Sequence, residues 1–418
     1  MQTWLKISLL LCFFGFLKEI RPSEPFIYEF LIGEWRNITS EEVTQYVYPV
    51  GTYSYLAQLV IVFLITDLSR YKPLIVVLGL SGIVVWAMLL WTKSLVELQI
   101  LEVFYGTFMA TEVAYYTYIY AKVPNEFYQQ VTSHTRAAIL TGRALSAVLA
   151  QLLVSFNVMD YRELNYITFA ALIFATIWAI FLPNVPKSIY FHRMLEENQE
   201  LTAAKYKTAF SLMKKHLTDS FSNRYVLKWS VWWALATAGF IQIQTYMQPL
   251  WAVIKPNSDN IYNGAVEALL TMLGAIGALL AGCLRTDWKY KGELVLSLCS
   301  ITAGAIMLVS SQTEEVFVSY AAYVGFGAIY HFMITIASTE IAKYIMEDSY
   351  GLVFGLNTLV ALVIQTFLTL CFVSGDLGLA LDPRDQFLVY GFYHIVIASI
   401  YIIIGLASWI QSRRSRPV

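Results

Sequence analysis

The sequence predicts an all-α membrane protein with twelve transmembrane helices arranged as six plus six. Three observations lead to this prediction. The 418 residues are 58% hydrophobic and 14% charged, with a mean hydropathy of +0.58, which is too apolar for a soluble globular chain of this length. Apolar runs of about 20 residues, the length that crosses a bilayer, recur between short polar loops. One long hydrophilic segment, 184–225, divides these runs into two groups of six.

The first apolar run is interrupted where the others are continuous. Its two apolar parts flank 18–25, which contains Pro22 and Pro25. Proline breaks helical hydrogen bonding, and a broken helix at membrane depth has to line a cavity or be buried in protein. A signal peptide is not indicated because no small-residue cleavage site follows the apolar part. The predicted spans are roughly 5–33, 46–66, 74–92, 97–121, 137–157, 164–183, 226–250, 263–284, 293–311, 316–340, 351–374 and 387–410.

Basic residues predict the orientation of these spans. With the N-terminus in the cytosol, 20 of the 28 Lys and Arg residues fall on the inner side and 5 on the outer side, as the positive-inside rule requires. Both termini are therefore expected in the cytosol. The glycosylation sequon at Asn37 falls in the first outer loop. The predicted domains are a six-helix bundle at 1–183, a cytosolic linker at 184–225, a second bundle at 226–410 and a tail at 411–418.

The sequence does not indicate an enzyme or a cofactor. Its four cysteines lie in apolar segments without CxxC spacing or neighbouring histidines, which indicates buried thiols rather than a disulfide framework or a metal site. It contains no phosphate-binding loop in a suitable context and no evident nucleophile–base pair. The near-zero net charge gives no reason to expect nucleic-acid binding.

The stretch 102–120 is the most informative part of the chain. It has the length and apolarity of a membrane helix but contains two carboxylates, Glu102 and Glu112. A charge at the bilayer centre costs about 3 kcal/mol on insertion scales, so it normally faces a cavity or a partner. Tyr115 and Tyr116 follow Glu112 at helical spacing, so we expect one face with a carboxylate and two rings. Such a face suits a flat cationic ligand.

Several segments resemble the reduced folate carrier family, which includes thiamine-transporting relatives. The resemblance extends in order over nearly all of the membrane part and rests on RPSEPF at 21–26, YPVGTYSYL at 48–56, DLSRYKP at 67–73, TEVAYY at 111–116, WSVWWALATAGFIQIQTY at 229–246, IYNGAVEA at 261–268 and LVFGLNT at 352–358. It implies a major facilitator arrangement and alternating access between the two bundles. The family also implies a plasma-membrane carrier, and we expect a monomer.

Within this family the charges favour thiamine, an organic cation, over folate. Folate carriers have basic residues where this chain has Glu112, Gly327 and Gln365, and TEVAYY is similar to the thiamine carriers. The resemblance transfers substrate contact to Glu24, Glu112, Tyr115 and Glu267, with Glu102 common to the family. The full set of expected substrate-binding residues is Glu24, Tyr53, Glu102, Glu112, Tyr115, Tyr116, Thr245, Glu267, His331 and Gln365.

Other interpretations remain open at this stage. The carboxylates could instead neutralise Lys18, Arg21 or Arg143, and the tyrosines and His331 could be packing residues. Arg143 could neutralise Glu112 and adapt the site to a zwitterion or a phosphorylated ligand. Gly51 and Thr245 replace a tryptophan and an asparagine of the thiamine carriers. The alternatives are a carrier of folate or another anionic vitamin, and a non-transporting membrane receptor.

Overall fold

The protein is all-helical in the part of the chain that the structure describes. The computed structural model describes residues 2–36, 38–186, 188–191, 203–256, 261–284 and 288–414. No strand occurs among these residues. The hydrophilic segment contributes a helix of its own, α8 (Ala203–Ser222).

The helices before α8 form the first half of the molecule. Their bounds are α1 Thr3–Lys18, α2 Ile27–Ile32, α3 Tyr48–Leu68, α4 Lys72–Trp91, α5 Leu95–Lys122, α6 Tyr128–Ser155 and α7 Leu164–Ile180. The start of α5 is fixed by a capping box, in which Ser94 and Glu97 satisfy each other's backbone N–H groups. Within this half α5 packs against α3 and α4, and α1 packs against α6 and α7.

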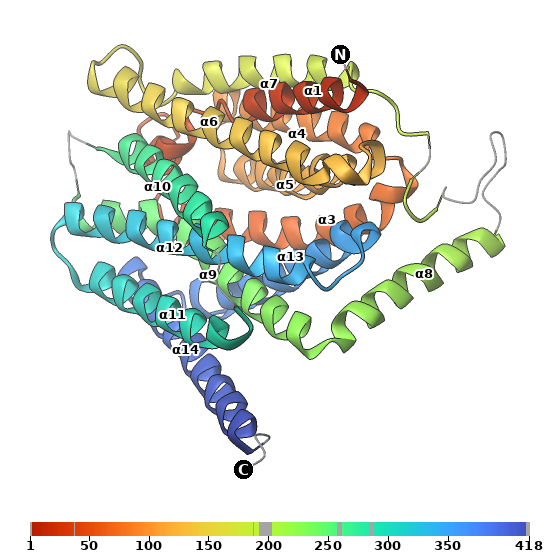
Figure 1. Ribbon diagram of the computed structural model, residues 1–418. Coiled ribbons are helices and arrows are strands. Elements are labelled where there is room, and N and C mark those ends of the chain that lie inside the picture. Colours follow the sequence, from red (N-terminus) through yellow and green to blue (C-terminus); the bar gives the residue numbers. More distant parts are fainter. Residues whose placement is uncertain are drawn as a thin grey trace.

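The helices after α8 form the second half. Their bounds are α9 Arg224–Ile254, α10 Asn263–Cys283, α11 Trp288–Gln312, α12 Val316–Ala342, α13 Tyr350–Leu368 and α14 Pro383–Arg414. Here α11 packs against α14, and α12 packs against α10 and α9. Figure 1 shows the two halves one above the other, with α10 beside α6 and α13 beside α3 at the boundary.

The interruption expected in the first apolar run is present. Helix α1 ends at Lys18, and the chain continues through turns and a short 3₁₀ segment, Glu24–Phe26, before α2 begins at Ile27. Pro25 lies inside the 3₁₀ segment, where its missing N–H is tolerated. The break places the charged side chains of 18–24 inside the molecule, and those of Lys18, Glu19 and Arg21 are each less than 10% exposed.

Eight of the described helices are long and apolar enough to cross a membrane. Their outward faces are apolar as well, and Leu279 on α10 remains 70% exposed. The helix α5 fails this criterion because it carries carboxylates and a lysine along its length, and α7 fails because it has only 17 residues. An apolar outer surface around a polar interior is the arrangement that a lipid environment favours.

Asp67, in the last turn of α3, holds the segment after α7 against the end of that helix. Its carboxylate accepts hydrogen bonds from the backbone N–H groups of residues 189–191, at 2.9 to 3.0 Å, and from the hydroxyls of Ser188 and Tyr71. Burial and the neighbouring Asp67 carboxylate raise the pKa of Tyr71, so its hydroxyl stays protonated and donates. Backbone N–H groups and two hydroxyls therefore supply the donors of this clamp around Asp67.

Candidate functional site

A central cavity of about 300 Å³ lies between the two halves of the molecule. The first half contributes the break after α1 together with α2, α3, α4, α5 and α6, and the second half contributes α9, α10 and α13. Polar groups from both halves meet aromatic walls there, among them Tyr48, Tyr55, Trp86, Tyr105 and Phe108. A cavity of this size with a few polar groups on an apolar wall is typical of a small-molecule site.

Six of the ten residues expected to bind substrate line this cavity. They are Glu24, Glu102, Glu112, Thr245, Glu267 and Gln365. They come from five different elements, so only the folded chain brings them together. The Thr245 hydroxyl donates to the backbone oxygen of Ile241 at 2.8 Å. The Gln365 side chain is 3% exposed, and its Oε1 has no hydrogen-bond partner among the described residues.

The other four expected residues are not among those lining the cavity. Tyr115 is fully buried, and its hydroxyl donates to the backbone oxygen of Leu11 at 2.9 Å, so it holds α5 to α1. Tyr116 donates to Oε1 of Glu112 at 3.1 Å from outside the cavity lining. His331 lies with its ring 5.5 Å from that of Phe240. For Tyr53, as for these three, substrate contact stays a prediction.

A buried ion-pair network surrounds Glu19, a residue that the sequence reading did not select. Its Oε1 lies 2.5 Å from Nζ of Lys18, and its Oε2 lies 2.8 Å from Nη2 of Arg21 and 3.1 Å from Nη2 of Arg143. The carboxylate is 1% exposed. A buried charge needs partners, and here one carboxylate meets three bases. The signal available in the sequence was the run of charges at 18–21 inside an apolar segment.

Two of the expected substrate carboxylates share these bases. Glu112 forms an ion pair with Lys18, and Oε1 of Glu24 lies 2.5 Å from Nη1 of Arg21. The partner of Glu112 is therefore Lys18, not Arg143. Three carboxylates and three bases make up this network, so it contributes no net charge when all six groups are ionised.

The other two carboxylates in the cavity have no basic partner among the described residues. Glu267 accepts a hydrogen bond from the hydroxyl of Tyr323 at 2.9 Å. Glu102 lies against the bare backbone of Gly51, where a Cβ would come within 2.2 Å of Oε2. The glycine therefore makes room for the carboxylate, and a tryptophan at this position would displace it. Of the described ionisable groups at the cavity and in its network, carboxylates exceed bases by five to three.

Two glutamines join the halves beside the cavity. Gln248 of α9 accepts from the N–H of Tyr28 at 3.1 Å and donates to the backbone oxygen of Glu24 at 2.9 Å. Gln151 of α6 does the same in the opposite direction, accepting from the N–H of Ala265 at 3.1 Å and donating to the oxygen of Ile261 at 2.9 Å. Each amide thus bridges the backbone of the other half with both of its polar atoms.

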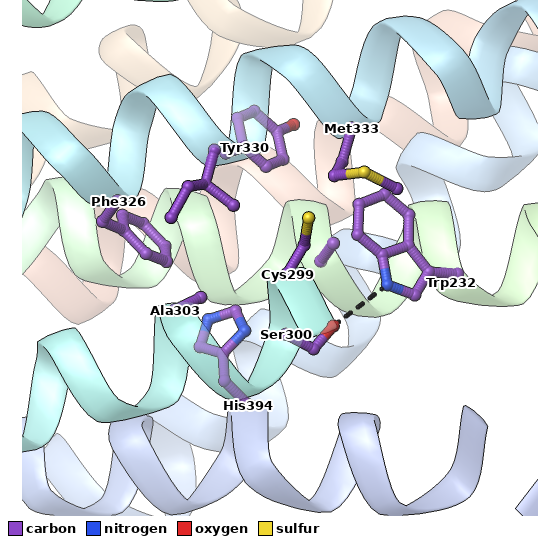
Figure 2. A pocket seen from close by; sticks show the side chains of 10 residues that line it. Trp232, Cys299, Ser300, Ala303, Phe326, Tyr330, Met333 and His394 are labelled. Atoms are coloured by element: carbon purple, nitrogen blue, oxygen red, sulfur yellow. Dashed lines mark hydrogen bonds between the residues drawn. The ribbon is translucent and has the colours of Figure 1, made fainter. Parts of the chain in front are cut away.

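A second cavity lies inside the second half and has a different character. It measures about 20 Å³, which is room for about one water molecule. Figure 2 shows its lining of Trp232, Cys299, Tyr330, Met333 and His394, with the Trp232 indole donating to Ser300. It is too small for an organic ligand, so the central cavity is the candidate site.

No metal-binding cluster of three His, Cys, Asp or Glu residues occurs among the described residues. The predicted glycosylation residue Asn37 lies outside them.

Comparison with known proteins agrees with this architecture. Thiamine transporter 1 of Homo sapiens is 39% identical over an alignment covering 99% of this chain and 92% of that protein. Folate transporter 1 of Caenorhabditis elegans is 37% identical, covering 96% of this chain and 92% of that protein. The crystal structure of the POT family transporter PepTSo superposes with a TM-score of 0.69 at 13% identity, covering 98% of this chain and 99% of that one, and is similar in fold alone.

The family profile described as reduced folate carrier matches residues 2–389, which is most of the chain. The match includes every element that lines the central cavity. The chain therefore belongs to the reduced folate carrier family.

Proposed function

We propose that this protein is a secondary transporter that carries thiamine, an organic cation, by alternating access. The observation that carries the proposal is the excess of carboxylates over bases around the central cavity. Neither Glu102 nor Glu267 forms an ion pair with a base among the described residues. An unneutralised carboxylate in a low-dielectric cavity favours a cation strongly. Thiamine brings a fixed positive thiazolium and an aminopyrimidine that donates hydrogen bonds.

The cavity walls suit the flat rings of such a cargo. Tyr48, Tyr55 and Tyr105 line the cavity beside the carboxylates. A cation over an aromatic face gains about 0.5 to 2 kcal/mol, more when water is excluded. In this proposal the rings hold the heterocycles while Glu102 and Glu267 balance the charge. No covalent step is needed, and entry into a negative-inside cell contributes about 2.3 kcal/mol per 100 mV for each positive charge.

The proposed topology is twelve spans with both termini in the cytosol. The proposed spans are the eight apolar helices together with α1, α5, α7 and α9. These four helices are shorter or carry polar residues toward the cavity. Basic residues support the orientation, because they concentrate on the inner side. The two six-helix bundles, 1–183 and 226–410, then rock about the cavity while 184–225 connects them. We propose the plasma membrane as the location and a monomer as the working unit.

Transport of folate or another anionic vitamin is the main alternative, because relatives of both kinds match this chain. That function would need Lys18, Arg21 and Arg143 as a cationic set. Each of these bases already contacts one or two carboxylates. The pairing disfavours a wholly anionic cargo of this size.

Uptake in cells that express the full chain tests the proposal. We expect saturable accumulation of labelled thiamine and none of labelled folate above control cells. Accumulation of folate without thiamine would overturn the proposed cargo. Binding of thiamine without accumulation in sealed vesicles would indicate a receptor instead.

A further inference from the structure

Two buried donors at the central cavity have no acceptor among the described residues. The hydroxyl of Ser146 on α6 belongs to a side chain that is 3% exposed, and the Nε of Arg21 to one that is 7% exposed. Both residues line the cavity. A buried polar group without a partner costs about 1 to 3 kcal/mol, so it is rarely left that way at a binding site.

Arg143 adds a third donor beside them. Its Nε and Nη2 both lie 3.1 Å from Oε2 of Glu19, which leaves Nη1 without an acceptor among the described residues. Arg21 contacts the same oxygen through Nη2 at 2.8 Å, so the two guanidinium groups are neighbours. Ser146 follows Arg143 by three residues on α6 and therefore lies on the same helical face. The Arg143 side chain is 39% exposed, so a ligand in the cavity can reach it.

These donors share one chemical preference. Guanidinium N–H groups and a hydroxyl in a desolvated cavity complement the oxygens of a phosphate or a carboxylate, and arginine binds such groups through two nitrogens at once. The carboxylates without an ion-pair partner among the described residues, Glu102 and Glu267, belong to α5 and α10, on other helices that line the same cavity. The cavity therefore presents groups for a cation and groups for an anion.

We infer that Arg21, Arg143 and Ser146 form an anion subsite, and that the cargo includes phosphorylated or carboxylated derivatives of the organic cation. The inference rests on the proposed function, since the cationic part of the ligand is the one assigned there. The subsite includes none of Glu112, Gly327 and Gln365, the three positions compared above with basic residues of folate carriers.

Binding to the purified full-length protein tests this subsite, with thiamine and its phosphate monoester as probes and inorganic phosphate as the free-anion control. We expect the wild-type protein to bind the monoester at least as tightly as thiamine. Ser146→Ala removes a hydroxyl that forms no hydrogen bond with a described residue, so folding should be preserved. This variant should lower the affinity for the monoester about tenfold and the affinity for thiamine less than twofold. Ser133→Ala, at an exposed position of the same helix, is the matched control and should change neither.

Arg143→Lys provides a second variant, because it keeps the positive charge beside Glu19 but loses the planar guanidinium that binds an anion through two nitrogens. It should also weaken binding of the monoester selectively. Three results would overturn the subsite and leave thiamine transport unaffected. The first is binding of thiamine without binding of the monoester, and the second is an equal loss of affinity for both in Ser146→Ala. The third is binding of inorganic phosphate as tightly as the monoester. Ser146-dependent binding of the monoester by a protein that does not bind thiamine would support the subsite and overturn the proposed cargo.

Discussion

Lys18 is the residue on which the buried charges at the break in the first span depend. Its ammonium contacts both Glu19 and Glu112 and is almost fully buried. Removing one partner from a buried ion pair leaves an uncompensated charge, at a cost of about 3 to 5 kcal/mol. We therefore expect Lys18→Met to lower the thermal unfolding midpoint of the detergent-solubilised protein strongly.

The double variant Lys18→Met with Glu112→Gln provides the internal control. It removes the base together with one of its two acids, so part of the lost stability should return. If the double variant is less stable than Lys18→Met by the full cost of Glu112→Gln alone, the two side chains are not coupled and this pairing is wrong.

Glu267 is the carboxylate whose role in cargo binding is easiest to isolate. It has a tyrosine partner but no base among the described residues, so Glu267→Gln removes charge without leaving a basic group unpaired. We expect thiamine uptake efficiency to fall about tenfold at equal surface expression. Glu314→Gln is the control, at a loop side chain that is 84% exposed and shares a surface ion pair with Arg384 at 3.2 Å, a type of pair that contributes little to stability. Equal uptake by the two variants would exclude Glu267 from the site.

The sequence located the candidate carboxylates but not their partners. A charge inside an apolar run is visible in the sequence, which is how Glu102, Glu112 and Lys18 were found. Which base pairs with which acid depends on how the break after α1 packs against α5 and α6. The direction of Tyr115 likewise depends on its contact with Leu11, 104 positions earlier in the chain.

At the scale of elements, the two glutamine bridges predict a reciprocal pattern of hydrogen exchange. Gln248→Leu removes the acceptor of the Tyr28 N–H, and Gln151→Leu removes that of the Ala265 N–H. Each variant should speed exchange about tenfold near its own target and leave the other target unchanged, so each serves as the control for the other. Faster exchange at both sites in either variant would show that the bridges open together.

The helices were more predictable than their interruptions. Apolar runs and proline pairs are local signals, and the break at 18–25 appears where the two prolines predict it. The π-helical segments at Glu42–Val47 and Thr369–Val373 were not anticipated, because they leave no such signal. The Asp67 contacts also could not be predicted from the sequence. Their donors are the backbone N–H groups of 189–191, and a backbone N–H group does not depend on the type of side chain.

For the whole molecule, the contact between α5 and α13 predicts that an engineered disulfide can hold the two halves together reversibly. A Cβ built on Gly351 would lie 3.6 Å from Cβ of Thr117, which is within the range for a disulfide. We expect the double variant Thr117→Cys with Gly351→Cys to lose uptake after oxidation and to recover it after reduction. Rocking of the bundles would have to separate these helices.

Each single cysteine variant controls for the four native cysteines and should transport under both conditions. Full uptake by the oxidised double variant, with the cross-link shown by mass spectrometry, would mean that these helices stay together during transport.

The sign of the cavity's charge is the property of the whole molecule on which the account depends. Composition predicted a membrane protein, the family resemblance predicted a transporter, and the carboxylates predicted a cationic cargo. Only the fold shows that two of these carboxylates form no ion pair with a base among the described residues. The most direct measurement is calorimetric titration of the purified protein with thiamine and, separately, with folate. The account predicts saturable binding of thiamine that is lost in the Glu102→Gln, Glu267→Gln double variant, and no binding of folate. Folate binding that persists in that variant, with none of thiamine, would contradict it.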